Sequence, residues 1–423
     1  MIRIYDTNSI SVDEILNREI KASGVEEIVA GIIADVKANG DKAVKAYTKK
    51  FDKAGLESLE VTEDEINEAF DAVDRKFIEV ITKARDNIAA FHKRQVRSDF
   101  VINDTPGVIL GQRVIPIEKV GLYVPGGTAP LPSTVLMTAV PAKIAGVSEI
   151  VMITPPNAEG KISPVILAAA KIAGVTRIFK AGGAQAVAAL AYGTETIPAV
   201  DKIVGPGNAF VAEAKKQVFG KVAIDMIAGP SDILVVADET CSARVVAADM
   251  LSQAEHDKLA TAVLVTNSEQ LARDVSAEIE RQLELLPRRE IARASIDNNG
   301  KIIIAESVRA AVEIANMIAP EHLEICVDNP FDYLGMVRNA GSVFLGKNCP
   351  EPLGDYFAGP NHTLPTNGTA RFSSPLSVDD FVKKTAFTYY TADALSEVCE
   401  DVAYFAEQEC LSAHARSATA RKN

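Results

Sequence analysis

The sequence predicts an α/β fold with parallel sheets, and its length and hydrophobic pattern are the observations that predict it. The 423 residues suffice for two or three domains of about 100–200 residues each. From residue 108 onward, short apolar runs alternate with stretches of helical period. The runs expected to be buried strands are 120–124, 149–154, 177–180, 202–205, 232–237, 261–266, 301–305, 323–327 and 341–345. Such alternation is typical of parallel strands joined by helices that cover the sheet faces.

Helices are predicted on both sides of this alternating region. Between residues 10 and 100 the first apolar stripe recurs at helical spacing, and it consists of Val25, Ile28, Val29, Ile32, Ile33 and Val36. Gly40 is expected to end that helix, and a second helical run covers 63–95. Residues 376–423 are expected to be mostly helical. This tail is too short to fold alone, so it must dock on the rest of the chain or on a partner subunit.

The composition excludes several classes of partner and location. A net charge of −13 and a pI near 5.1 disfavour nucleic acid and anionic membrane surfaces. The chain has no uncharged run long enough for a transmembrane helix, and its first residues lack the pattern of a signal peptide. The five cysteines are odd in number, widely spaced and without a CxxC motif. We therefore expect reduced thiols and a cytoplasmic location.

Two short motifs can carry chemistry on or beside regular elements. Gln253 and His256 lie three residues apart near the end of a predicted helix, so they share a face and could both ligate a metal. A histidine that only interacts with the helix dipole is the simpler interpretation. Glu321 and His322 precede a predicted strand and could supply two proton-transfer groups. A capping or surface pair is an equally good interpretation of those two residues.

Further candidates lie toward the C-terminus. Residues 348–375 are dense in Pro and Gly, and a long segment of this kind inside a compact domain is often functional. Asp355 stands in it between Gly354 and Tyr356, although acidic residues are also common in ordinary turns. Glu409 and His414 lie in the last predicted helix, where a solvated surface is the simpler interpretation.

Gly-rich stretches at predicted strand ends indicate a phosphate-bearing ligand. They are residues 121–127, 182–185, 205–208 and 229–231. Glycine allows the backbone to approach a ligand, and a helix N-terminus favours a phosphate. The dinucleotide fingerprint GxGxxG is absent, because Phe210 stands where Gly205 and Gly207 would need a third glycine. Plain turn chemistry is therefore the alternative for these stretches.

Taken together, these stretches resemble the histidinol dehydrogenase family over nearly the whole chain. Nine motifs that carry the resemblance occur in order. They are GLYVPGG (121–127), GGAQAVAALAYGTE (182–195), KIVGPGNAFV (202–211), IDMIAGPSD (224–232), LSQAEH (251–256), APEHLEI (319–325), AGSVFLG (340–346), GPNHTLPTNGTARFSSPLSVDDF (359–381) and LSAH (411–414).

The resemblance implies two incomplete Rossmann-like modules with parallel sheets and small helical terminal segments. One module would combine residues 26–119 with 236–375 and carry the metal and acid–base residues, and the other, 120–235, would bind NAD. Residues 1–25 would form an N-terminal segment. The helical tail, 376–423, would be swapped in a homodimer so that its residues act in the partner's site.

The resemblance also implies a role for each candidate residue. The ligands of one Zn²⁺ per subunit would be Gln253, His256, Asp355 and His414. The NAD contacts would be Tyr123, Gln185 and Asn208. Ser231 and Glu409 would bind substrate together with the metal ligands and His322, and Glu321 and His322 would form the catalytic acid–base pair. Two imidazoles with oxygen donors suit zinc, and manganese or cobalt could substitute.

The activity implied is the zinc-dependent, four-electron oxidation of L-histidinol to L-histidine through L-histidinaldehyde with two NAD, the final steps of histidine biosynthesis. The main alternative is a paralogous NAD-dependent dehydrogenase of another small primary alcohol, for example a sulfonated diol. Ser231 and Glu409 match the histidinol pattern and discriminate against it. A non-catalytic zinc protein is disfavoured by the Glu321–His322 pair. A metal-free Rossmann dehydrogenase is disfavoured by the missing fingerprint.

Overall fold

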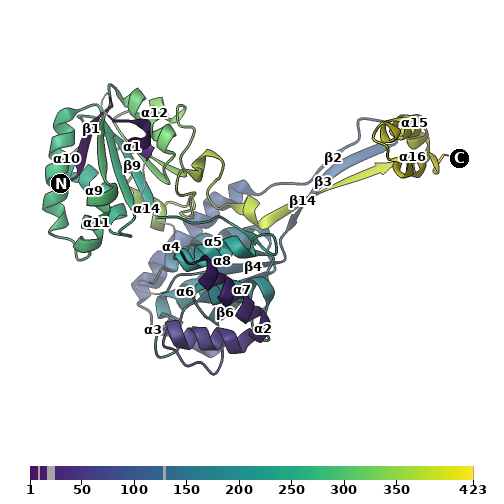
Figure 1. The fold of residues 1–423 in the computed structure, drawn as a ribbon, viewed down its shortest axis with the longest axis horizontal. Helices are drawn as coiled ribbons and strands as arrows, with labels where there is room; N and C mark the ends of the chain where they lie inside the picture. The colour runs from purple at the N-terminus through teal and green to yellow at the C-terminus, as the bar shows by residue number, and fades with distance from the viewer. Residues whose placement is uncertain (8–9, 17–23, 127–129, 423) are drawn as a thin grey trace.

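The computed structural model describes residues 1–7, 10–16, 24–126 and 130–422. Figure 1 shows two α/β lobes and an arm that extends from them to the C-terminal helices. Each lobe is built around one parallel sheet, and the arm contains a third, antiparallel sheet. The predicted α/β class with parallel sheets is confirmed.

The first lobe contains a six-stranded parallel sheet, here sheet A, in the order β1-β11-β10-β9-β12-β13. Its strands are β1 (Arg3–Asp6), β9 (Asp232–Ala237), β10 (Thr261–Thr266), β11 (Lys301–Ile304), β12 (His322–Cys326) and β13 (Ser342–Leu345). The helices of this lobe are α1 (Val12–Leu16), α9 (Ala243–Ala254), α10 (Glu269–Leu283), α11 (Arg289–Asn299), α12 (Val308–Ile318), α13 (Phe331–Leu334) and α14 (Glu351–Tyr356). Because helices cover both faces, β9 is buried at every position.

The second lobe contains a five-stranded parallel sheet, here sheet B, in the order β6-β5-β4-β7-β8. Its strands are β4 (Lys119–Tyr123), β5 (Glu149–Thr154), β6 (Arg177–Lys180), β7 (Lys202–Val204) and β8 (Ala223–Ile224). The helices of this lobe are α2 (Glu26–Phe51), α3 (Glu63–Ala72), α4 (Arg75–His92), α5 (Pro132–Ala145), α6 (Pro164–Ala173), α7 (Gly183–Tyr192) and α8 (Ala209–Val218). Both faces of this sheet are therefore also covered.

The N-terminal helices pack on sheet B, and this corrects the predicted grouping of 26–119 with 236–375. Val36 of α2 shares a hydrophobic core with Phe179 of β6, and Ile88 of α4 shares one with Leu122 of β4. Within the predicted N-terminal segment, 1–25, β1 pairs with β11 and so joins sheet A. A helical stripe shows that one face is buried but does not show which sheet buries it.

Helix α2 follows the predicted stripe with two differences. Ile28, expected in the stripe, is 54% exposed, whereas Val29, Ile32 and Val36 are buried. Gly40 interrupts the helix with φ 49° and ψ −132°, but the chain resumes helical geometry and continues to Phe51. The predicted stop is therefore a kink.

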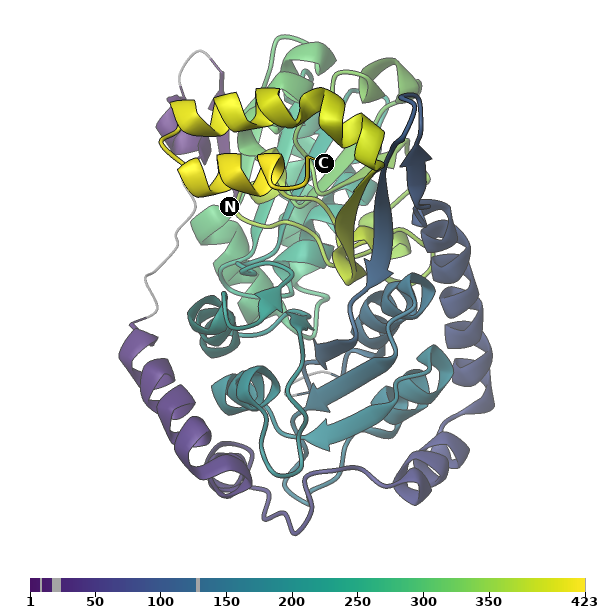
Figure 2. The ribbon, with the colours of Figure 1, turned by 90° about the vertical axis from the view of Figure 1, so that its right-hand side faces the viewer.

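The arm adds a long strand, which was not predicted, to a tail that is otherwise mostly helical as predicted. It contains β2 (Phe100–Ile102), β3 (Val108–Pro116) and β14 (Val382–Tyr390), and β14 pairs antiparallel with β3 along its full length. Only beyond β14 do α15 (Ala392–Gln408) and α16 (Ser412–Thr419) form the predicted helices, which lie side by side in Figure 2. β14 is exposed at nearly every position, so no alternating pattern marks it as a strand.

Three short 3₁₀ helices complete the described structure: η1 (Lys93–Gln95), η2 (Thr369–Arg371) and η3 (Val378–Phe381). Within the described ranges, no helix combines the length and the apolar character needed to cross a membrane. The cysteines are all free thiols, of which Cys410 is exposed and Cys349 is partly exposed.

Candidate active site

The predicted acid–base pair lies where the chain leaves α12 and enters β12. Ala319 caps α12 in the left-handed region with φ 52°, a conformation that costs a non-glycine residue about 1–2 kcal/mol. Pro320 and Glu321 follow, and His322 is the first residue of the strand. The pair therefore stands at the amino end of β12, as the sequence predicts.

Glu321 is held by a reciprocal pair of hydrogen bonds with Asp232, the first residue of the neighbouring β9. The Asp232 N–H donates to Glu321 Oε2 at 3.0 Å, and the Glu321 N–H donates to Asp232 Oδ1 at 2.8 Å. Burial raises the pKa of Glu321 well above its usual value, and the nearby Asp232 charge acts in the same direction. This carboxyl is therefore a stronger base than an exposed glutamate.

His322 is oriented by the same strand. Its Nδ1 lies 3.1 Å from the Asp232 carbonyl oxygen, so Nδ1 carries the proton and Nε2 keeps its lone pair. The side chain is 4% exposed. Burial lowers the pKa of His322 and outweighs the nearby charge of Asp355, which raises it. The lowered pKa favours the neutral imidazole. A neutral imidazole with a free lone pair can accept a proton from substrate.

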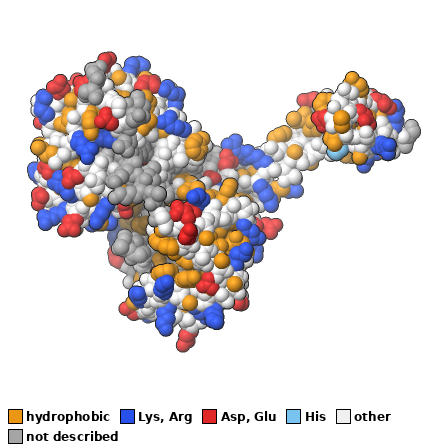
Figure 3. Space-filling model, in the orientation of Figure 1, with side chains coloured by type: hydrophobic (Ala, Val, Ile, Leu, Met, Phe, Trp, Pro, Cys, Tyr) orange, Lys and Arg blue, Asp and Glu red, His pale blue; other side chains and the backbone are white. Residues whose placement is uncertain are grey.

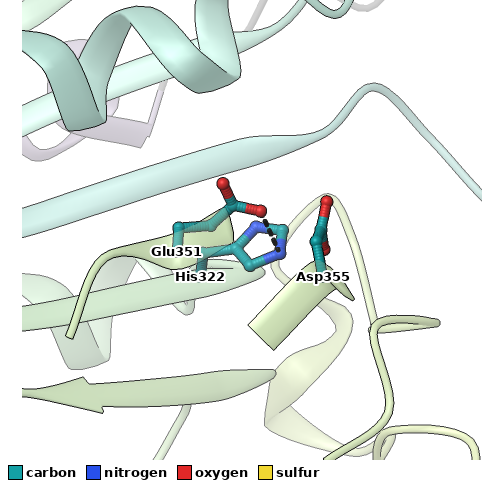
Figure 4. Close-up of side chains that lie close together, drawn as sticks. All are labelled: His322, Glu351 and Asp355. Carbon is teal, nitrogen blue, oxygen red and sulfur yellow. Dashed lines mark ion pairs between the residues drawn. The ribbon is translucent and has the colours of Figure 1, made fainter. Parts of the chain in front are cut away.

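A cluster able to hold a metal ion surrounds Nε2. His322, Glu351 and Asp355 each offer a ligand atom, and these atoms lie within 4.8 Å of one another. In Figure 4 the His322 ring lies between the two carboxylates, and its Nε2 is 3.6 Å from Glu351 Oε1. Burial, reinforced by Asp355, raises the pKa of Glu351 to about 9. An imidazole with two oxygen donors is chemistry that a divalent metal accepts.

The sequence interpretation missed Glu351 and His362. Glu351 and Asp355 lie four residues apart on α14, so they share one helix face, and that spacing was the available signal. His362 lies in the loop beyond α14, with its Nδ1 3.7 Å from Asp355 Oδ1. Burial lowers the pKa of His362. His322, Asp355 and His362 line one small cavity of about 100 Å³.

The predicted metal ligands divide into two groups. Asp355 belongs to the cluster, and α9 reaches it where Ser252 Oγ lies 3.5 Å from Glu351 Oε2. The next residue, Gln253, is buried, and the following loop brings His256 close enough for its charge to lower the pKa of His322. His414 is not brought to this site, since α16 lies at the tip of the arm, away from both lobes (Figure 1).

The two remaining predicted substrate residues are also separated. Ser231 directly precedes β9, and its carbonyl accepts a hydrogen bond from the Thr261 N–H at 3.1 Å, so it stands beside Asp232 at the amino end of sheet A. Glu409 lies between α15 and α16, at the tip of the arm.

The donor atoms fit a metal. Gln253 Oε1, His322 Nε2 and Glu351 Oε1 are buried and have no hydrogen-bond partner within the described part of the chain. An unsatisfied buried polar atom costs about 1–3 kcal/mol, so three of them near one cluster indicate a missing bound group. The available oxygen and nitrogen donors include no thiolate and suit zinc, manganese or cobalt.

A cavity of about 770 Å³ opens beside this cluster. The three predicted NAD contacts, Tyr123, Gln185 and Asn208, all line it, and so does His256. Its wall in the second lobe consists of loops at the carboxyl ends of the strands of sheet B, the usual ligand position in parallel sheets. Gly127, also predicted at this site, lies outside the described residues.

The size and chemistry of the cavity fit a dinucleotide. Asp52 and Gln185 both line it, and Asp52 Oδ2 and Gln185 Oε1 are buried without a partner among the described residues. Both atoms are acceptors that a ligand's hydroxyl or amino group can satisfy. The N-terminus of α7, at Gly183, also faces the cavity and suits a phosphate.

A buried ion pair supports the loop that carries Asn208. Lys215 Nζ is paired with Asp225 and donates to the Gly205 carbonyl at 2.9 Å. The Gly205 N–H in turn donates to Asp225 Oδ2 at 2.7 Å. A Cβ at Gly205 would lie 2.1 Å from the Tyr123 carbonyl oxygen. A glycine is therefore needed here because two backbone segments lie close together, which agrees with a structural role in the turn.

Two unlike compartments thus meet between the lobes: a long cavity at the carboxyl ends of sheet B and a buried imidazole–carboxylate cluster at the amino end of sheet A. This arrangement defines an α/β enzyme that holds a large ligand beside a metal-compatible proton-transfer site. The histidinol dehydrogenase family model matches residues 16–422. The chain belongs to the histidinol dehydrogenase family, whose members are oxidoreductases.

Individual relatives agree with this assignment. The histidinol dehydrogenase of Clostridium acetobutylicum is 54% identical over 100% of this chain and 99% of its own length. That of Bacillus subtilis is 54% identical over 96% of each chain. The crystal structure of histidinol dehydrogenase from Elizabethkingia anophelis matches with a TM-score of 0.95 and 41% identity, over 99% of this chain and 98% of that one. The fold and its family are thus supported by sequence and by structure.

Proposed function

We propose that this chain oxidises L-histidinol to L-histidine through L-histidinaldehyde, with one Zn²⁺ per subunit and two NAD, in the cytoplasm. The observation that carries the proposal is the buried, unpartnered Gln253 Oε1 of the described chain, together with Asp355 beside the His322 imidazole and a neighbouring cavity of about 770 Å³. Membership of the histidinol dehydrogenase family supports the choice of substrate.

The residues have distinct tasks in this proposal. His322 accepts the alcohol proton at Nε2, the nitrogen without a hydrogen-bond partner in the described chain. Glu321 then accepts a proton from the water that attacks the aldehyde carbon, and burial, which raises the pKa of this carboxyl, makes it a stronger base than an exposed glutamate. Ser231, Glu409 and the metal ligands orient the substrate. The buried site keeps bulk water from the aldehyde.

The bound groups supply chemistry that the side chains lack. Gln253, His256 and Asp355, with His414 of the partner subunit, would hold Zn²⁺, which would supply a fixed positive charge that orients the substrate. Tyr123, Gln185 and Asn208 would hold NAD, which accepts the hydride in each oxidation.

The test is the stoichiometry of NADH formation before and after metal removal. We expect about two NADH for each L-histidinol consumed, because two successive hydride transfers are needed to reach the acid. Exhaustive chelation should abolish turnover, and added zinc should restore it. One NADH per substrate would contradict the four-electron reaction, and full activity after verified metal removal would contradict the metal requirement.

We further propose a homodimer in which the arm crosses to the partner. Apolar side chains are exposed along the arm and at its tip, where Tyr404 is 70% and Phe405 is 67% exposed. Figure 3 shows hydrophobic side chains gathered on this part of the molecule. An exposed apolar surface of this kind is typical of a subunit interface. Crossing of the arm would deliver Glu409 and His414, which a single chain leaves far from its own site.

Mixed dimers test this arrangement. A dimer of one His414→Ala chain and one His322→Ala chain should recover activity, because the intact body of one chain meets the intact tail of the other at one of its two sites. Each variant alone should be inactive. Purified mixed dimers, separated by two different affinity tags, should show about half of the wild-type activity if the tail acts in trans. Failure to exceed the activity of the parent variants would refute tail exchange.

A further inference from the structure

Asp52 is a half-buried acid that none of the steps above uses. It ends α2, directly after Phe51, and its backbone N–H donates to the Thr48 carbonyl at 2.9 Å. Its side chain lines the large cavity together with Phe51 and Tyr123. The helix end thus fixes an acidic side chain in the cavity wall.

One oxygen of the Asp52 carboxylate is free to accept a hydrogen bond. Oδ2 is buried and has no hydrogen-bond partner within the described part of the chain. Burial raises the pKa of Asp52 to about 6, so the group is still ionised at pH 7.5 to 8. Arg288 is the basic residue among the described cavity-lining residues, and no ion pair joins it to Asp52. A buried carboxylate oxygen without a hydrogen-bond partner is costly unless a ligand donates to it.

The position of Asp52 indicates which part of a dinucleotide it meets. The reacting nicotinamide must lie toward His322, and the cavity wall on that side comes from the first lobe, with His256 and Tyr356. Asp52 belongs to the second lobe, and its neighbours Phe51 and Tyr123 offer rings on which a planar base can stack. The adenosine half of the dinucleotide therefore falls on the side of Asp52.

We propose that Asp52 is a specificity-determining residue for the cofactor and that its carboxylate accepts a hydrogen bond from the adenosine half of NAD. The donor is the 6-amino group of adenine or the 2′-hydroxyl of its ribose, and both present the same chemistry to the carboxylate. This inference rests on the proposed use of NAD. It adds a determinant that acts on affinity and selectivity and takes no part in proton transfer.

Equilibrium binding, measured by calorimetry on the zinc-loaded full-length enzyme without substrate, tests the inference. The ligands are NAD, nicotinamide hypoxanthine dinucleotide, which lacks the 6-amino group, and NADP, which lacks the free 2′-hydroxyl. We expect Asp52→Asn to weaken NAD binding by about tenfold or more, since a hydrogen bond to a charged acceptor contributes this much. Asp35→Asn is the matched control, because Asp35 lies on the same helix but outside the cavity lining.

The two analogues separate a direct contact from a structural effect. If the 6-amino group is the donor, wild type and Asp52→Asn should bind the hypoxanthine analogue about equally, because the lost partner leaves nothing for the substitution to remove. If the 2′-hydroxyl is the donor, Asp52→Asn should bind NADP at least as tightly as wild type, because the substitution removes the repulsion between the carboxylate and the 2′-phosphate. Equal weakening of all three ligands, or unchanged NAD affinity in Asp52→Asn, would overturn the role of Asp52. Failure of the wild type to bind NAD would instead overturn the proposed cofactor itself.

Discussion

Replacing His322 by Asn is expected to lower kcat for L-histidinol oxidation by about 10²- to 10⁴-fold, the usual contribution of a positioned general base. Asn suits the purpose because its amide N–H can replace the Nδ1 contact with the Asp232 carbonyl oxygen, 3.1 Å away. The substitution removes Nε2, the atom with the free lone pair, while keeping the link between β12 and β9. The loss should therefore reflect chemistry more than disorder.

The separate roles proposed for His322 and Glu321 are tested by assaying L-histidinol and L-histidinaldehyde as separate substrates. His322→Asn should impair alcohol oxidation more than aldehyde oxidation. Glu321→Gln should do the reverse, because it removes the proposed base for water activation. Its amide oxygen can still accept from the Asp232 N–H, so the local structure should be kept. Equal loss of both half-reactions in Glu321→Gln would refute its assignment to water activation.

A second buried histidine provides the control for His322. His92 is also fully buried, and its Nδ1 lies 2.9 Å from the Ile88 carbonyl oxygen. We expect His92→Asn to keep kcat within about tenfold of wild type, because His92 lies outside the acid–base cluster. If His92→Asn lowered kcat as much as His322→Asn does, the loss of any buried histidine would explain the effect, and proton transfer by His322 would not be needed.

Replacing Asp225 by Ala is expected to lower the free energy of unfolding by about 3–5 kcal/mol. The side chains of Lys215 and Asp225 are 2% and 1% exposed, so the substitution leaves a buried ammonium without its counter-charge. It also removes the acceptor of the Gly205 N–H, in the loop that leads to Asn208. Urea unfolding at one fixed protein concentration measures the change, since dissociation of a dimer would otherwise contribute.

Two comparisons show whether the buried charge causes the loss. Adding Lys215→Met to Asp225→Asn removes the charge and keeps an acceptor for the loop, so it should cost much less than Asp225→Ala. On the surface, Glu269→Ala breaks an exposed pair with Arg273 and should cost no more than about 0.5 kcal/mol. An Asp225→Ala variant within 1 kcal/mol of wild type would contradict this account.

The proposed acid–base pair was visible in the sequence, but its partners were not. Glu321 and His322 are adjacent, and an acid beside an imidazole before a strand is a recognisable pattern. Asp232 orients both from a position about ninety residues earlier in the chain. Glu351 reaches the same site from α14, and His362 reaches it from the loop beyond that helix. No local pattern contains such contacts, because they form only when β9, β12 and α14 come together.

The sequence by itself determined nine strands of the two parallel sheets, and it left out β1 and β8 at their edges. Each apolar run became a strand within a residue or two of its predicted bounds, since burial on both faces requires continuous apolar residues. Only the tertiary structure decided that α2 to α4 cover sheet B, that β14 extends an exposed arm, and that His414 lies far from His256 in one chain. The physical reason is that hydrophobic periodicity records whether a face is buried, whereas the partner that buries it is set by long-range packing.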